Sequence, residues 1–150
     1  MKLTIIIPVY NEIKSIKILL DKVIKQNIDK QIIVIDDYSK DGSREEILTN
    51  FQDRVDKIIL HEKNLGKGAA IISAKNYIQG DYVIIQDADL EYDPDQYKLF
   101  IDLIKKNNID ALYGSRVLKK EKYSNVQNFS HKIRIWGNIF LTYISNKINN

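Results

Sequence analysis

Short runs of β-branched and aliphatic residues alternate with longer amphipathic segments over most of the chain. The short runs predict strands at residues 3–7, 31–36, 55–60, 82–86 and 111–113. Apolar residues at helical spacing from Ile13 to Ile24 predict a helix, and Ser43 with Glu46 forms a capping box before another. Asp93 with Pro94 opens a third helix, whose inner stripe is Tyr97, Phe100, Ile101 and Ile104.

This order of strands and helices predicts an α/β fold. Strands that are apolar throughout are typical of a mainly parallel sheet with helices on both faces. Ligands bind such sheets beyond the carboxyl ends of the strands, which places four loops together at residues 8–12, 36–42, 62–68 and 87–93. A length of 150 residues without an internal repeat predicts one domain.

Composition excludes several classes of protein. The chain has no cysteine, so disulfides and thiolate metal sites are ruled out. A formal charge of +3 is too small to indicate a nucleic-acid partner. The apolar runs are too short to span a bilayer, and Pro8, Asn11 and Glu12 interrupt the apolar start too early for a signal peptide. We therefore expect a cytoplasmic protein, with the inner face of the membrane as a candidate location.

The segment Gln86-Asp87-Ala88-Asp89 carries the most informative chemistry. Two aspartates one residue apart follow an apolar strand, and on an extended backbone their side chains point the same way. Such a pair can address one Mg²⁺ or Mn²⁺ ion and leave positions open for phosphate oxygens. An isolated Asp-x-Asp is common, and turn or cap residues are the ordinary alternative.

Five segments taken in order resemble the signatures of family 2 glycosyltransferases. They are residues 4–12, 32–43, 64–68, 80–94 and 113–116. The amino acids at residues 86–94, together with Gly114-Ser115-Arg116, resemble those of one branch of the family, the dolichol-phosphate mannosyltransferases and other polyprenol-phosphate sugar transferases.

The resemblance implies the three-layer, Rossmann-like glycosyltransferase-A fold and a GDP- or UDP-sugar donor. It implies nucleotide-binding roles that we list together: Pro8, Tyr10 and Glu12 for base and ribose, Asp37 for a ring N–H of the base, and Asp87, Ala88 and Asp89 for ribose, diphosphate and metal. It places Glu91 as a further metal-side ligand. Asp89 and Arg116 are the expected catalytic residues, Arg116 facing the diphosphate or the acceptor phosphate.

Two further cations are candidates for phosphate contacts. Gly66-Lys67-Gly68 is too short for a phosphate-binding loop. Lys67 is a candidate phosphate contact only if a helix starts at this point beside the donor diphosphate. Arg134 lies in an aromatic stripe between Phe129 and Ile144, which fits either a core-facing helix or peripheral contact with a membrane. His61 and His131 have no partner pattern, and neither is expected to be catalytic.

The chain is shorter than members of the branch, which continue with another strand and a loop that closes over the acceptor. The leading interpretation is a metal-assisted, inverting transfer of the sugar to a polyprenol phosphate, and three alternatives stay open beside it. They are a donor-binding module without independent turnover, a receiver domain suggested by Asp36-Asp37, and a nucleotidyltransferase. An unpaired sheet edge next to the missing strand also predicts either self-association into a homo-oligomer or a mobile C-terminal segment that folds back over the gap.

Overall fold

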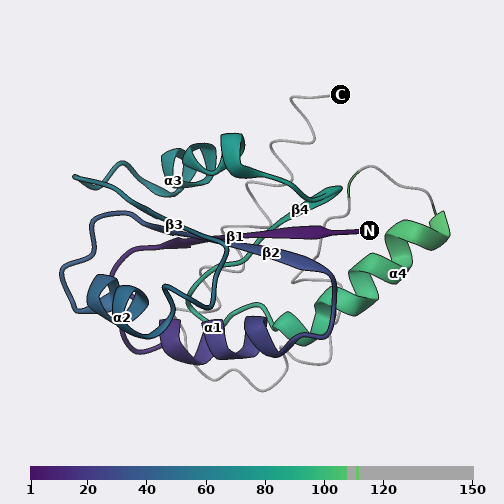
Figure 1. Ribbon diagram of the computed structural model, residues 1–150, viewed down its shortest axis with the longest axis horizontal. Coiled ribbons are helices and arrows are strands. Elements are labelled where there is room, and N and C mark those ends of the chain that lie inside the picture. The colour runs from purple at the N-terminus through teal and green to yellow at the C-terminus, as the bar shows by residue number, and fades with distance from the viewer. Residues whose placement is uncertain (108–110, 112–150) are drawn as a thin grey trace, which may run out of the picture. The chain divides into compact units, whose positions relative to one another are not determined.

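The computed structural model describes residues 1–107 and 111, and Figure 1 shows their arrangement. Residues 1–107 belong to one unit, Met1–Asp110, and Ala111 begins a second. The strand predicted at residues 111–113, the aromatic stripe and the candidates Arg116 and Arg134 lie outside the described part of the chain.

Within residues 1–107, four parallel strands form a sheet in the order β3-β2-β1-β4. Their bounds are Leu3–Val9 for β1, Lys30–Asp36 for β2, Lys57–Leu60 for β3 and Tyr82–Ile85 for β4. Each agrees with a predicted strand to within two residues. Ile5 lies opposite both Ile32 and Ile84, so the apolar centres of three strands are aligned. Crossover to β4 at the far side of β1 leaves the carboxyl ends of β1 and β4 side by side.

Helices cover both faces of this sheet (Figure 1). One face packs against α1 (Ile16–Lys25), α2 (Ser43–Asn50) and α4 (Tyr97–Asn107), and the other packs against α3 (Lys67–Ser73). The alternation of side chains along β1 explains the two layers, because Ile5 and Ile7 join the first core whereas Ile6 joins the second. The predicted three-layer α/β fold is confirmed.

The start of α4 follows the prediction, but the start of α2 does not. Asp93 caps the 3-10 turn Pro94–Gln96, which leads into α4. The capping box of Ser43 and Glu46 is wrong, because Gly42 is the N-cap of α2 and no side chain caps it. The Ser43 hydroxyl is drawn away from that role, since it donates to Asp41 Oδ1 at 2.6 Å and accepts from the Glu12 N–H at 2.8 Å.

Gly80 fixes the entry into β4. A Cβ atom at this position would lie 2.6 Å from the backbone nitrogen of Thr4 and 2.8 Å from the carbonyl oxygen of Lys2. The Gly80 N–H donates to the Thr4 hydroxyl at 2.9 Å. Only glycine permits this close approach of the two chains, which sets the register of β4 against β1.

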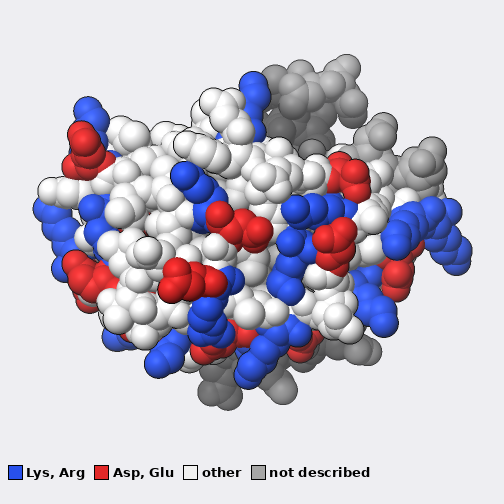
Figure 2. Space-filling model, in the orientation of Figure 1, with Lys and Arg blue, Asp and Glu red and all other residues white. Residues whose placement is uncertain are grey.

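Charge and hydropathy of the described part add two observations. Acidic and basic side chains are interspersed over the face in Figure 2, without a broad patch of one sign. None of the helices within residues 1–107 is long and apolar enough to cross a membrane.

Candidate functional site

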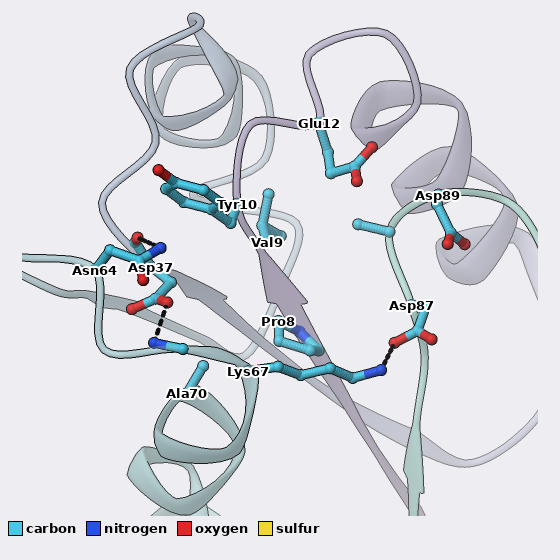
Figure 3. Close-up of a pocket in the computed structure, with 12 residues that line it drawn as sticks. Pro8, Val9, Tyr10, Glu12, Asp37, Asn64, Lys67, Ala70, Asp87 and Asp89 are labelled. Carbon is cyan, nitrogen blue, oxygen red and sulfur yellow. Dashed lines mark hydrogen bonds and ion pairs between the residues drawn. The ribbon is translucent and has the colours of Figure 1, made fainter. Parts of the chain in front are cut away.

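A pocket of about 420 Å³ opens at the carboxyl ends of the strands (Figure 3). Every wall of it is a segment that leaves a strand or begins α3. The lining residues are Pro8, Val9, Tyr10, Glu12, Asp37, Asn64, Gly66, Lys67, Ala70, Asp87, Ala88 and Asp89. The position is the one that parallel α/β sheets use for ligands.

Eight residues that the sequence predicted for the site line this one pocket. They are Pro8, Tyr10, Glu12, Asp37, Lys67, Asp87, Ala88 and Asp89. Figure 3 shows Tyr10, Asp37 and Asn64 at one end and Asp87 with Asp89 at the other. An elongated ligand with an aromatic head and an anionic tail would match these two ends.

Asp37 is the most heavily bonded side chain of the pocket. Its Oδ1 accepts from the Leu65 N–H at 2.8 Å, and its Oδ2 accepts from the Gly66 N–H at 2.8 Å. The His61 ring lies 2.7 Å from Oδ1. Burial alone would raise the pKa of Asp37, but the hydrogen bonds from Leu65, His61 and Gly66 outweigh it and hold the pKa below its usual range. Asp37 is therefore a fixed carboxylate at neutral pH.

His61 has a structural connection that the sequence did not reveal. It follows β3 directly and is buried, with Nδ1 at Asp37 and Nε2 2.8 Å from the Ser73 hydroxyl of α3. Arg44 donates to its carbonyl oxygen at 2.7 Å. One feature of the sequence could have indicated a role for His61: it follows a predicted strand directly, and the loops after the other three strands carry predicted site residues.

A buried glutamine holds the acidic loop after β4. Gln86 Nε2 donates to the carbonyl oxygens of Asp87 at 3.0 Å and Tyr92 at 3.1 Å, which closes the loop between them. Its Oε1 accepts from the Tyr97 hydroxyl of α4 at 2.6 Å. Burial raises the pKa of this hydroxyl above its ordinary value, with the charge of Asp93 adding to the shift, so it stays protonated and donates.

Asp87 and Asp89 stand on this loop with different exposure. Asp89 is exposed, and its Oδ1 accepts from the Glu91 N–H at 3.0 Å. Asp87 is half-buried and forms an ion pair with Lys67, which reaches across from the start of α3 (Figure 3). The ammonium of Lys67 occupies the carboxylate that the sequence assigned to a metal ion.

The structure does not gather Asp87, Asp89 and Glu91 into one cluster. Within residues 1–107, no group of three or more His, Cys, Asp or Glu side chains is arranged to hold a metal ion. Leu90, at a φ of 64°, turns the chain between Asp89 and Glu91, and Glu91 does not line the pocket. Mg²⁺ takes one or two protein carboxylates together with substrate phosphates, so the prediction of a metal ion at Asp87 and Asp89 does not require a third carboxylate.

Tyr10 and Glu12 complete the wall that leaves β1. Tyr10 is 49% exposed and lines the pocket, so part of its side chain is accessible to a ligand. Glu12 accepts from the Ser15 hydroxyl at 2.8 Å through Oε2. Four carboxylates and one ammonium thus face the pocket, a charge that disfavours a diphosphate unless a cation accompanies it.

The parallel sheet, the helices on both of its faces and the pocket at its carboxyl edge together define an α/β protein with a ligand pocket at the strand ends. The sequence profile of glycosyl transferase family 2 matches residues 4–149. The chain belongs to this family, which excludes the receiver domain and the nucleotidyltransferase.

The names of two curated relatives contain a lipid phosphate. The chain is 32% identical over 127 residues to a dolichol-phosphate mannosyltransferase of Pyrococcus furiosus, covering 83% of this chain and 36% of the relative. It is 36% identical over 101 residues to an undecaprenyl-phosphate 4-deoxy-4-formamido-L-arabinose transferase of Proteus mirabilis, covering 63% and 31%. The chain therefore spans about a third of the length of these relatives.

Solved structures share the fold. TarS 1-349 of S. aureus in complex with UDP-GlcNAc has a TM-score of 0.65 at 22% identity, over 80% of this chain and 38% of that one. The mannosyltransferase PcManGT of Pyrobaculum calidifontis, in complex with GDP-Man and Mn²⁺, has a TM-score of 0.53 at 27% identity, over 58% and 27%.

Proposed function

We propose that this chain binds a nucleoside diphosphate sugar and supports transfer of the sugar to a polyprenol phosphate. The observation that carries the proposal is the polarity of the pocket, with Tyr10 and Asp37 at one end and Asp87 and Asp89 at the other. The lipid-phosphate names of two relatives support the acceptor. The UDP-GlcNAc and GDP-Man complexes of two neighbours support the donor.

In this proposal the base lies against Tyr10 and donates a ring N–H to Asp37, while Pro8 and Glu12 line the ribose. Asp87 and Asp89 would hold Mg²⁺ or Mn²⁺, and a bound ion would neutralise the charge that develops on the diphosphate leaving group. Lys67 would leave Asp87 and pair with a phosphate oxygen. Arg116 and Arg134, outside the described residues, are proposed for the acceptor side.

The chemistry is a single displacement with inversion at the anomeric carbon. An oxygen of the acceptor phosphate forms the new bond to this carbon while the bond to the nucleoside diphosphate breaks and its electrons pass to the leaving oxygen. The acceptor phosphate is already ionised, so no side chain has to remove a proton from it. The residues required are therefore those that position the donor and stabilise the leaving group, with Asp89 and Arg116 as the proposed catalytic pair.

A donor-binding module that needs a partner for turnover is the second candidate. One feature favours it: the pocket groups on residues 1–107 are all proposed for the donor, whereas the proposed acceptor groups, Arg116 and Arg134, lie outside the described residues. In either case the polyprenol phosphate would require work at a membrane surface, so we propose a location at the inner face of the membrane with peripheral contact.

Titration calorimetry of the full chain with UDP and GDP, in Mn²⁺ and in EDTA, tests the proposal. Asp89→Ala should abolish the metal-dependent part of binding and leave the circular dichroism spectrum unchanged. Asp53→Ala, an exposed aspartate away from the pocket, is the matched control. Equal binding of the manganese–nucleotide complex by Asp89→Ala and the parent would show that the metal assignment is wrong. Transfer to a polyprenol phosphate by the purified chain separates the enzyme from the binding module.

A further inference from the structure

The acceptor capacity of Asp37 is almost completely used by the protein itself. Each oxygen of a carboxylate offers about two lone-pair positions. Oδ1 accepts from the Leu65 N–H at 2.8 Å and faces His61 Nδ1 at 2.7 Å, so both of its positions are taken. Oδ2 has one partner among the described residues, the Gly66 N–H at 2.8 Å. One acceptor position therefore remains for a ligand, and it is on Oδ2.

His61 cannot easily release Oδ1. A carboxylate only accepts, so Nδ1 must carry the proton and donate it to Asp37. The opposite edge of the ring is held by the Ser73 hydroxyl at 2.8 Å, and this hydroxyl also lies 2.9 Å from the Ala69 carbonyl oxygen. The side chain of His61 is only 7% exposed, and that of Asp37 only 4%. The imidazole is thus fixed at both ends in a nearly dry site.

Nucleotide bases differ in what they present to such a carboxylate. Uracil offers one ring N–H between two carbonyl groups, whereas guanine offers a ring N–H beside an amino group. A pair of adjacent donors is best satisfied by both oxygens of a carboxylate. With Oδ1 saturated, Asp37 can satisfy one donor and would leave the second unpaired in a site with little access to water, which is costly.

A second group beside Asp37 offers a donor to the base. The amide Nδ2 of Asn64 donates to the Asp37 carbonyl oxygen at 3.4 Å, and Asn64 lines the pocket. Its remaining N–H is a donor next to the carboxylate. A carbonyl group flanks the ring N–H of uracil and of guanine alike, so Asn64 can serve either base and the discrimination depends on Asp37.

We propose that the connected side chains of Asp37, His61 and Ser73 make the base pocket select uracil over guanine nucleotides, with His61 as the positioning residue. The inference rests on the proposed function, and it names UDP-sugars as the donor class of the same pocket. His61 touches no substrate in this arrangement. It acts by occupying Oδ1 and leaving a single acceptor position for a single ring N–H.

The experiment compares UDP and GDP binding to the full chain in Mn²⁺ by titration calorimetry. The parent should bind UDP about tenfold more tightly than GDP, the factor expected when one buried donor is left unpaired. His61→Phe keeps a ring but frees Oδ1, so it should bring the two affinities to within about twofold. His61→Asn retains a donor at the position of Nδ1 and should restore most of the preference.

Ser73→Ala is the milder variant, which keeps the test decisive if His61→Phe does not fold. It loosens the ring without removing the donor, and should reduce the preference to between those of the parent and His61→Phe. Equal affinities of the parent for UDP and GDP would overturn the inference and leave the proposed function intact. A purely structural role of His61 would also overturn it, and would show as equal losses for both nucleotides. Failure of the parent to bind either nucleotide would overturn the proposed function itself.

Discussion

Lys67→Met is the substitution that best probes the anionic end of the pocket. In the structure the Lys67 ammonium pairs with Asp87 Oδ1, so we expect it to compete with a divalent cation that approaches Asp87 (Figure 3). Methionine removes the charge and keeps most of the side-chain length. We therefore expect the variant to bind Mn²⁺ more tightly than the parent when no nucleotide is present.

The size of the effect follows from the exposure of the two partners. Two unit charges about 4 Å apart interact by about 4 kcal/mol at an effective dielectric constant of about 20. The Lys67 side chain is 56% exposed and that of Asp87 20%, so solvent screening and side-chain entropy remove most of this energy. A residual of about 1 kcal/mol corresponds to an increase of about fivefold in Mn²⁺ affinity.

Electron paramagnetic resonance of free and bound Mn²⁺ measures this affinity without any turnover. Lys63→Met is the matched control, because Lys63 is exposed on the same loop and has no ion pair within the described part of the chain. With UDP present the sign should reverse, since the ammonium released from Asp87 would then pair with the diphosphate. Equal Mn²⁺ affinity in the parent and Lys67→Met, without nucleotide, would refute the competition between lysine and metal.

Three other predictions address the base pocket, the acidic loop and the sheet edge. Asp37→Asn should weaken UDP binding by about 1–3 kcal/mol. Folding lowers the pKa of Asp37. Its contribution to stability is therefore present at pH values above its pKa in the unfolded chain, and is lost as the pH falls through its pKa in the folded protein. The melting temperature of Asp37→Asn should accordingly fall less steeply than that of the parent on acidification below about pH 4. Tyr97→Phe leaves Gln86 Oε1 buried without its donor and should lower the free energy of unfolding in urea by about 1–3 kcal/mol, whereas an unchanged unfolding midpoint would contradict that contact. Among the described strands β4 pairs only with β1, and it exposes Val83 and Ile85, so we expect self-association in light scattering; a monomer at every concentration would disprove it.

The sheet could be predicted from the sequence because its strands are apolar on both faces. β1 and β2 are buried almost throughout, and their runs of isoleucine and valine have no competing helical spacing. The start of α2 was predicted less well. A capping box is a local pattern, and here Asp41, two residues before Ser43, competes successfully for the hydroxyl that the pattern assigned to the helix.

The site was predictable where it depends on strand ends, and unpredictable where it depends on contacts between elements. Eight candidates meet in one pocket because each closely follows a strand or begins a helix at the same edge of the sheet. His61 was missed because its partners, Asp37 and Ser73, come from β2's end and from α3, at 24 and 12 residues' separation. The pairing of Lys67 with Asp87 likewise depends on where α3 packs, which no local spacing encodes.

Backbone conformation gives a physical reason why the loops of the site resist prediction from local preference. Three non-glycine residues of the described part have positive φ, namely Asn11 at 56°, Tyr38 at 68° and Leu90 at 64°. Each directly follows a residue that lines the pocket. Side chains as large as tyrosine and leucine disfavour this region by about 1–3 kcal/mol each, so neighbouring contacts must stabilise it.

Those contacts come from other elements of the fold. The Asn11 N–H donates to the Ser39 hydroxyl at 2.9 Å, and its side-chain oxygen accepts from the Lys40 N–H at 2.9 Å, which ties the first loop to the second. Gln86 closes the loop that contains Leu90 in the same way. Because tertiary hydrogen bonds impose these turns against local preference, the groups they carry are positioned before a ligand arrives. A ligand then binds without having to order the loops, which lowers the conformational entropy cost of binding.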